Sequence, residues 1–130
     1  MSLTKLQREQ VWKKYGGRCA YCGEPIELKD MQADHIKPIF RGWDDQLKAH
    51  LPEGHLGDNS IENFNPACRA CNFRKGTSDI EGFREALEHG LDCCRRDFTY
   101  RMMVRYGLVV EQPKKVQFYF EKFNQKEIIL

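Results

Sequence analysis

The sequence has little net charge, no long apolar run and no low-complexity segment. Its 21 Lys and Arg residues nearly balance its 19 Asp and Glu residues, so the net charge of +2 gives no general argument for a nucleic-acid partner. No window offers the roughly 18 apolar residues of a membrane-spanning helix, and the N-terminus lacks the apolar core of a signal peptide. These absences and the length of 130 residues predict one cytoplasmic domain.

Cysteine, by contrast, is abundant. The chain has six cysteines, and four of them form two C-x-x-C pairs, Cys19 with Cys22 and Cys68 with Cys71. In a chain without a secretory signal, such pairs bind metal more often than they form disulfides. Two C-x2-C pairs separated by a long gap are typical of one tetrahedral zinc site closed by four thiolates. We therefore expect all four to bind one structural Zn²⁺.

The second pair lies within residues 58–76, a stretch that also carries asparagines and basic residues. An acid and a histidine stand side by side between the two pairs, at the end of a predicted strand. In their order along the chain, these motifs resemble the pattern of HNH endonucleases with a zinc-bound core, over roughly residues 12–90. The residues that carry the resemblance are Cys19, Cys22, Asp34, His35, Asn63, Cys68, Cys71, Asn72, Lys75 and Gly76.

The resemblance implies an α+β fold, with a ββα-metal, treble-clef-like core beside a four-cysteine zinc knuckle. We expect this nuclease core and an N-terminal helix over residues 1–90, and a helix-and-strand extension packed on it over residues 91–130. One position departs from the name-giving pattern, because Asn72 stands where that pattern has histidine. Many relatives share this variant, so the departure does not itself indicate an inactive protein.

Hydrolysis of a phosphodiester needs a proton acceptor for water, charge neutralisation at the phosphate and help for the departing oxygen. The first task suits His35, because imidazole exchanges protons near neutral pH. A divalent cation suits the other tasks, and Asp34 and Asn72 offer the oxygen ligands that Mg²⁺ or Mn²⁺ prefers. The resemblance further implies that Asn63 orients His35 through a hydrogen bond.

The adjacent positions of Asp34 and His35 pose a geometric difficulty, since neighbours on an ideal strand point to opposite faces. Both side chains must serve one phosphate, so we expect the strand to end, twist or bulge at this point. The predicted helix 66–75 must then lie across the strand, so that Asn72 comes near Asp34.

Basic residues gather in two places. Arg74 and Lys75 end the predicted helix 66–75 and are expected to bind DNA phosphate. A second group lies on a predicted helix over residues 91–106 and forms either an ordinary solvated face or a contact with the DNA backbone. Its members are Arg95, Arg96, Arg101 and Arg105.

Local signals predict the remaining elements. Thr4 and Gln7 form a capping box for a helix that ends near Tyr15, and Asn65 is the expected N-cap of the helix 66–75. Ser78 and Glu81 form a second capping box. Further expected elements are extended segments at 25–26 and 31–36, a loop over 40–59 with a short helix at 44–49, a helix ending at Gly90, and a strand from Lys115.

Four other residues carry weaker signals. His50 and His55 lie in the predicted loop and are expected to be solvated, with a substrate contact or an auxiliary metal ligand as the alternative. Cys93 and Cys94 are adjacent, a spacing that gives strained disulfides. We expect these two to be core or surface thiols.

Together these features predict a metal-dependent endonuclease that cleaves DNA, most simply double-stranded DNA, with Zn²⁺ as a structural ion and Mg²⁺ or Mn²⁺ as the catalytic ion. A non-catalytic zinc-ribbon module that binds nucleic acid is the leading alternative, and a zinc-stabilised protein-interaction domain is another. A pure binding module has no need of a histidine base beside a carboxylate. The resemblance also implies a phage, restriction or mobile-element setting.

Overall fold

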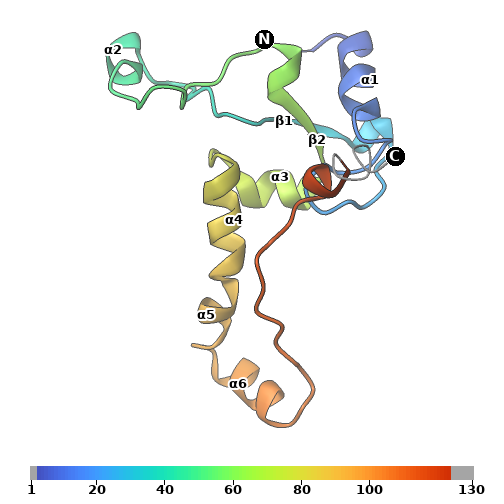
Figure 1. The fold of residues 1–130 in the computed structure, drawn as a ribbon, viewed down its shortest axis with the longest axis vertical. Helices are drawn as coiled ribbons and strands as arrows, with labels where there is room; N and C mark the ends of the chain where they lie inside the picture. Colours follow the sequence, from blue (N-terminus) through green and yellow to red (C-terminus); the bar gives the residue numbers. More distant parts are fainter. Residues whose placement is uncertain (1–2, 124–130) are drawn as a thin grey trace.

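The computed structural model describes residues 3–123 and shows a mixed α/β fold with one two-stranded sheet (Figure 1). Strand β1 (Gln32–His35) pairs antiparallel with β2 (Phe64–Ala67), and the register places His35 opposite Phe64. The expected strand at 31–36 is therefore confirmed. Its partner is the segment directly before the second cysteine pair, so the sheet lies next to both C-x-x-C motifs.

The N-terminal helix α1 (Lys5–Lys13) begins as predicted, because the Thr4 and Gln7 side chains cap each other's backbone. It ends two residues before the predicted end. Val11 on this helix packs with Met31 and Phe64 in a small buried cluster. This cluster attaches α1 to the hairpin.

The expected helix 66–75 is wrong at its start. Pro66 lies in β2 opposite Ala33, and helix α3 (Arg69–Lys75) begins only after Cys68. Asn65 is buried and hydrogen-bonds to Lys14, so its side chain does not cap the helix. The N-cap is Cys68, whose sulfur accepts from the Cys71 amide. Proline is tolerated in β2 because a two-stranded sheet consists of edge strands.

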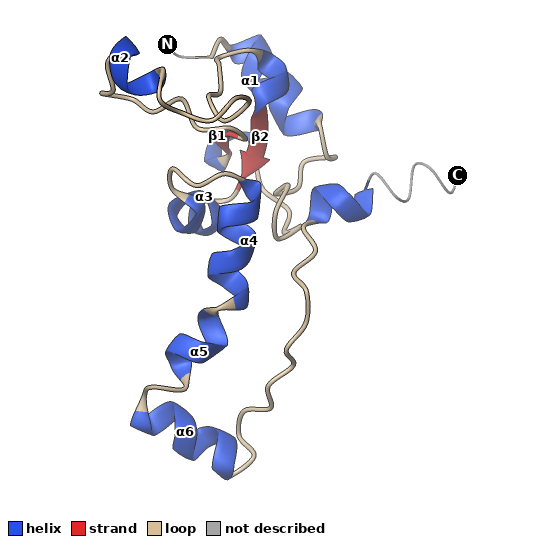
Figure 2. Cartoon of the chain, turned by 60° about the vertical axis from the view of Figure 1, so that its left-hand side comes forward, coloured by secondary structure: helices blue, strands red, loops and turns tan. Residues whose placement is uncertain are grey.

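Three helices follow α3 and extend away from the sheet as an arm (Figures 1 and 2). The capping box expected at Ser78 is replaced by Asp79, whose carboxylate accepts from the Gly82 amide. The continuous helix expected over 91–106 is broken, because Asp97 caps a new helix through the Tyr100 amide. The arm comprises α4 (Ile80–Glu88), α5 (Gly90–Cys94) and α6 (Phe98–Arg105).

The strand expected from Lys115 is absent within the described residues. Residues 108–118 return along the arm without regular structure, and residues 119–123 are helical (Figure 2). The alternation of apolar side chains still identified core residues, because Phe118 is buried and Val116 and Phe120 pack beside it. Within the described residues, the segment pairs with neither strand of the sheet. Its amides at Tyr119 and Phe120 instead donate to carbonyls of the loop that carries the first cysteine pair.

The larger buried cluster lies under this returning segment and contains Cys19, Tyr21, Ala67, Phe83 and Phe118. Three short elements complete the described chain: a 3-10 turn η1 (Leu28–Asp30), helix α2 (Asp45–Lys48) in the long loop as expected, and a 3-10 turn η2 (Ile61–Asn63). Within residues 3–123, no helix has the length and apolar character to cross a membrane.

Candidate active site and metal centre

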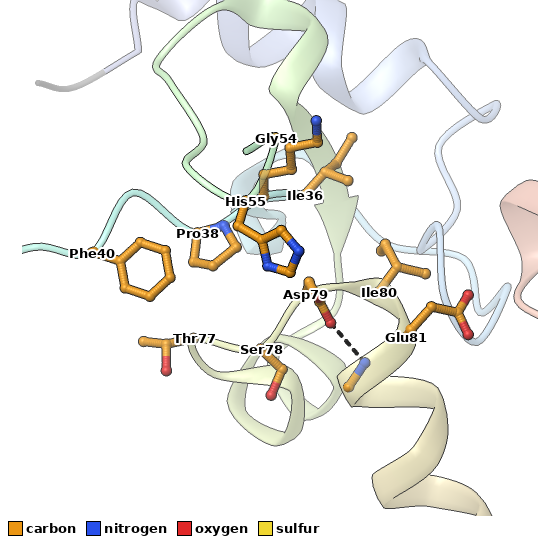
Figure 3. A pocket seen from close by; sticks show the side chains of 12 residues that line it. Ile36, Pro38, Phe40, Gly54, His55, Thr77, Ser78, Asp79, Ile80 and Glu81 are labelled. Carbon is orange, nitrogen blue, oxygen red and sulfur yellow. Dashed lines mark hydrogen bonds between the residues drawn. The ribbon is translucent and has the colours of Figure 1, made fainter. Parts of the chain in front are cut away.

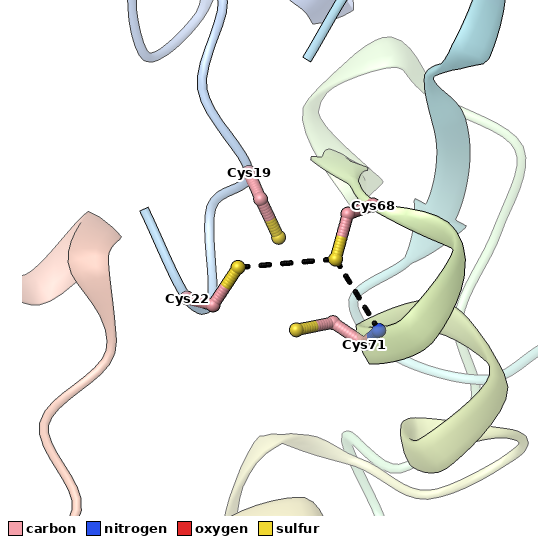
Figure 4. A group of neighbouring side chains, drawn as sticks. All are labelled: Cys19, Cys22, Cys68 and Cys71. Atoms are coloured by element: carbon pink, nitrogen blue, oxygen red, sulfur yellow. Dashed lines mark hydrogen bonds between the residues drawn. The ribbon is translucent and has the colours of Figure 1, made fainter. Parts of the chain in front are cut away.

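The two C-x-x-C pairs converge on one point between the N-terminal loop and the start of α3 (Figure 4). The sulfurs of Cys19, Cys22, Cys68 and Cys71 all lie within 4.8 Å of one another, and those of Cys22 and Cys68 are 3.8 Å apart. Tetrahedral Zn²⁺ with bonds of about 2.3 Å requires sulfurs separated by about 3.8 Å. The donor set and its spacing therefore fit a four-thiolate metal site.

A tight turn places the first pair. The Cys19 amide donates to Glu24, and the Gly23 amide donates back to Cys19, each over 2.9–3.0 Å. Gly23 has φ +80° and faces the Tyr119 ring, so a Cβ there would approach that ring to 2.9 Å. Glycine is required at this position on both counts.

The pKa values of the Cys19, Cys22 and Cys71 thiols are shifted by burial and by neighbouring sulfurs. A hydrogen bond from Cys71 lowers the pKa of Cys19 to about 4, whereas burial raises the pKa of Cys22 to about 11. The bond to Cys19 also raises the pKa of Cys71 far above its ordinary value. Neighbouring thiolates disfavour one another, so charge concentrates on Cys19. A bound cation supplies the positive charge that four thiolates together need.

Three of the four residues expected to be catalytic line one pocket of about 360 Å³. Asp34 and His35 reach it from the end of β1, and Asn72 reaches it from α3. Although both residues are paired within β1, which ends at His35, both line this pocket. Asn63 does not line this pocket. The Asn72 side-chain amide has no hydrogen-bond partner among the described residues.

Asp34 is a buried carboxylate with two donors on one oxygen. The Tyr21 hydroxyl donates to Oδ2 over 2.5 Å, and the Lys75 ammonium lies 3.1 Å from the same atom. Burial raises the pKa of Asp34, and these two contacts oppose that rise. Burial and the nearby carboxylate raise the pKa of Tyr21 well above its ordinary value, so the phenol remains a donor.

Lys75 does not have the position expected of a phosphate ligand. Its side chain is 1% exposed, and its ammonium donates to the His35 carbonyl over 2.8 Å besides pairing with Asp34. The cation therefore holds the end of β1 from inside the fold. Arg74 is exposed but lines a different pocket, beside Cys22 and Cys71.

The His35 ring lies against Phe64, with ring centroids 4.5 Å apart, and its Nε2 is 2.9 Å from Asn59 Oδ1. A proton on Nε2, donated to Asn59, leaves Nδ1 as an acceptor. The Asn63 side chain bonds instead to the backbone N–H and C=O of Lys37 and to the carbonyl of Asp58. The expected partner of His35 is thus replaced by Asn59.

The four arginines of the arm do not share one helix. Arg95 pairs with Asp92 and Glu111, over 2.9 and 2.8 Å. Arg101 donates to the carbonyls of Arg95 and Arg96. Within the described residues, the Arg96 and Arg105 guanidinium groups have no hydrogen bond or ion pair. Cys93 and Cys94 are exposed, as one of the two expectations for them required.

Two residues of this site escaped sequence reasoning. Tyr21 lies inside the first C-x-x-C pair, and its position next to the ligands was the available signal. Asn59 lies in an asparagine-rich stretch where several residues are equally plausible turn formers. Only the folded chain shows which asparagine faces His35.

No family model matches the chain. A SPbeta prophage-derived protein of Bacillus subtilis, YoqL, which is named as an HNH endonuclease, is 35% identical over 75 residues, or 57% of this chain and 30% of its own length. A CRISPR-associated endonuclease Cas9 of Corynebacterium diphtheriae is 31% identical over 77 residues, or 59% of this chain and 6% of its own length. The chain thus spans less than a third of either relative.

Among solved structures, the Type II-C Cas9 enzyme of Actinomyces naeslundii is similar with a TM-score of 0.49 and 21% sequence identity. The similarity covers 65% of this chain and 8% of that one.

Proposed function

From its similarity to proteins named as an HNH endonuclease and as Cas9, we propose that the chain is an HNH-type, metal-dependent endonuclease that hydrolyses phosphodiester bonds of DNA. The observation that carries the proposal is the shared pocket of Asp34, His35 and Asn72, which combines a base, a carboxylate and an amide. The names of both sequence relatives support an endonuclease. The prophage origin of one relative supports a phage-derived setting.

The proposal includes a ββα-metal core made of β1, β2 and α3. In it the four cysteines hold Zn²⁺ and serve the fold. Cys71 and Asn72 are adjacent on α3, so a metal ion that holds Cys71 in place also holds Asn72 in its position relative to β1. We propose residues 1–90 as the nuclease core and residues 91–130 as an extension that packs on it through the returning segment around Phe118.

His35 is the proposed general base. Nδ1 takes a proton from water, while the Nε2–H bond to Asn59 and the Phe64 ring hold the imidazole in place. Asp34 and Asn72 would hold a divalent cation, for which a free carboxylate oxygen and an unpaired amide are a fitting, weak donor set. When bound, Mg²⁺ or Mn²⁺ supplies Lewis-acid stabilisation of the phosphate and the departing oxygen.

Tyr21 and Lys75 act on Asp34. A buried carboxylate is costly to keep ionised, and two donors on one of its oxygens compensate for the lost water. The other oxygen, Oδ1, has no hydrogen-bond partner among the described residues and is the proposed metal ligand. Arg74 is the remaining proposed phosphate contact near the core, with double-stranded DNA as the proposed substrate.

The test is cleavage of supercoiled plasmid by the purified chain with Mg²⁺ or Mn²⁺. We expect relaxed or linear products, and we expect His35→Ala to lose about 10²–10⁴-fold in rate while retaining zinc and fold. His89→Ala is the matched control, since this histidine lies on the arm with its side chain 73% exposed. DNA binding without any cleavage by the wild-type chain would favour a zinc-ribbon binding module instead.

A further inference from the structure

The long loop between the two strands leaves the fold through a narrow, hydrogen-bonded neck. The Asn63 side chain bonds both the N–H and the C=O of Lys37, each over 3.0 Å. The Gly57 amide donates to Pro38 over 2.9 Å. A Cβ on Gly57 would come within 1.9 Å of the Lys37 carbonyl, so only glycine allows this approach. The neck therefore fixes the position in space of Lys37 and Pro38, from which the segment at Phe40 continues.

An aromatic pair follows the neck at once. The Phe40 and Trp43 ring centroids are 4.9 Å apart, and the Trp43 amide donates to the Phe40 carbonyl. Phe40 has φ +54°, and it is the sole non-glycine residue of the described chain with a positive φ. Bulky residues rarely adopt this conformation, and such outliers concentrate at functional sites. The neck and turn thus hold two rings in a costly arrangement.

These rings form one side of the candidate active-site pocket. Phe40, Arg41 and Trp43 line the same hollow as Asp34 and His35. Phe40 also lines a neighbouring hollow of about 450 Å³, where it lies with Pro38 across from Thr77 and Ser78 (Figure 3). The Phe40 ring therefore stands at a boundary between two open hollows and is not enclosed in a core.

Trp43 differs from the other tryptophan in this respect. Trp12 donates its indole N–H to Ile26 and packs on the buried cluster around Val11. Trp43 is 42% exposed, and its indole N–H has no partner among the described residues. Beside it, Arg41 is exposed and makes no hydrogen bond or ion pair within the same part of the chain. An open indole next to an unpaired guanidinium suits a flat, anionic ligand such as a nucleotide.

We propose that Phe40 and Trp43 form a stacking platform for the nucleobase that flanks the scissile phosphate, with Arg41 contacting a phosphate of that nucleotide. The inference rests on the proposed function, which names DNA as the ligand. A base exposes its face to a side chain only when it is unstacked from its neighbour. The platform therefore favours substrates that are unpaired or distorted next to the cleaved bond, because their bases cost less to unstack.

The experiment measures Trp43 fluorescence in a His35→Ala, Trp12→Phe protein, which has one tryptophan and is expected to bind DNA while cleaving it far more slowly than the wild type. The probes are a fully paired short duplex and the same duplex with one central mismatch. We expect quenching by both, with about five- to a hundredfold tighter binding of the mismatched duplex. With affinity read from the anisotropy of dye-labelled duplexes, which needs no tryptophan, Trp43→Ala should abolish this preference, and Trp43→Phe should retain it.

If Trp12→Phe does not fold, the same fluorophore is isolated in the His35→Ala protein by subtracting the signal of His35→Ala, Trp43→Phe from that of His35→Ala. Unchanged Trp43 fluorescence at saturating DNA, or equal affinity for the two duplexes, overturns the platform. Cleavage plays no part in this readout. A protein that shows the quenching and the preference but never cuts DNA overturns the proposed endonuclease and leaves the platform standing, whereas absent DNA binding overturns both.

Discussion

The Asp34 carboxylate joins the two halves of the site. Its Oδ2 accepts a hydrogen bond from the Tyr21 hydroxyl, and Tyr21 lies between Cys19 and Cys22, two of the proposed metal ligands. The Tyr21 ring packs edge-on against Phe83, with centroids 5.4 Å apart. A shift of the cysteine loop would therefore move the hydroxyl that fixes Asp34, so a metal ion bound by the four cysteines would act on the proposed catalytic pocket through one side chain.

Removing that hydroxyl tests the link. We expect Tyr21→Phe to fold and retain zinc, because the ring remains, but to need more Mg²⁺ and to lose about 10–100-fold in activity. The measurement is the Mg²⁺ concentration for half-maximal cleavage, set beside DNA affinity, which should not change. Tyr100→Phe is the matched control, since that hydroxyl bonds Glu111 on the arm. An unchanged Mg²⁺ requirement in Tyr21→Phe would mean that the hydroxyl does not affect metal binding and that Tyr21 serves only in packing.

Two asparagines divide the tasks that the sequence assigned to one. Asn59→Ala should lower turnover while preserving stability, because Asn59 is exposed and touches the His35 ring. Asn63→Ala should lower stability by about 1–3 kcal/mol, because three hydrogen bonds at the loop neck are lost. Urea unfolding and single-turnover cleavage of both variants check the division. If Asn59→Ala turns over at the wild-type rate, Asn59 does not orient the His35 imidazole.

At the scale of elements, α3 links the cysteine cluster to the candidate pocket within seven residues. It begins directly after Cys68, presents Asn72 to the pocket, and ends at buried Lys75. Local signals predicted its end, since Gly76 follows with φ +55°. They failed at its start, because Asn65-Pro66 reads as a helix entry while tertiary bonds to Lys14 and Ala20 hold it in a strand.

The returning C-terminal segment is held by Arg84. Its guanidinium makes a bidentate pair with Glu121, each bond 2.9 Å, and lies over the Phe118 ring. An alternating pattern predicts an extended segment but not what that segment packs against. Here it packs against helix α4 and the loop of the first cysteine pair. The alternation therefore identified the buried side chains, but the prediction of a strand from Lys115 was wrong.

This attachment predicts a pH dependence. The Arg84 hydrogen bonds lower the pKa of Glu121 below its ordinary 4.5. A carboxylate whose pKa is lower in the folded protein than in the unfolded chain stabilises the fold at pH values above its unfolded-state pKa. That stabilisation disappears as the pH falls through its folded-state pKa. Near neutral pH, the free energy of unfolding of the wild-type protein should exceed that of Glu121→Gln by on the order of 1 kcal/mol. The difference should vanish well below pH 4.5 in urea unfolding. A difference that is constant with pH would contradict the ion pair's role.

At the scale of the molecule, the arm projects from the core and carries exposed arginines away from the candidate pocket (Figure 1). Arg95 and Arg101 are engaged within the arm, whereas Arg96 and Arg105 have no partner among residues 3–123. If the arm contacts DNA, the two unengaged guanidinium groups are the ones available to phosphate.

We therefore expect the double variant Arg96→Gln, Arg105→Gln to bind DNA more weakly and to reduce the salt dependence of log Kd by about 0.9 for each lost phosphate contact. Sequence preference should not change, since phosphate contacts carry no sequence information. The comparison variant is Arg95→Gln with Arg101→Gln, which should mainly lower stability. An unchanged salt slope in the first variant would make the arm an ordinary solvated surface.

Cysteine spacing predicted that the four sulfurs would come together, because two C-x-x-C pairs form a local pattern in the sequence. The Asp34-His35 pair was also readable, since two chemistry-bearing residues were adjacent in the chain. The burial of Lys75 and the Asn59 contact were not readable, because each depends on a partner far away in the sequence. Lys75 donates to a carbonyl 40 residues before it, and His35 bonds an asparagine 24 residues after it. No local pattern records such separations.

The proposed active site, the pocket of Asp34, His35 and Asn72, is separate from the four-cysteine centre. Brief EDTA treatment tests it, with cleavage, zinc content and circular dichroism followed on one sample. Four thiolates should retain zinc and fold, while two weak oxygen donors should release the catalytic ion, so cleavage should disappear and return with added Mg²⁺. Cleavage that persists without any divalent ion, or wild-type cleavage by His35→Ala, would contradict the account.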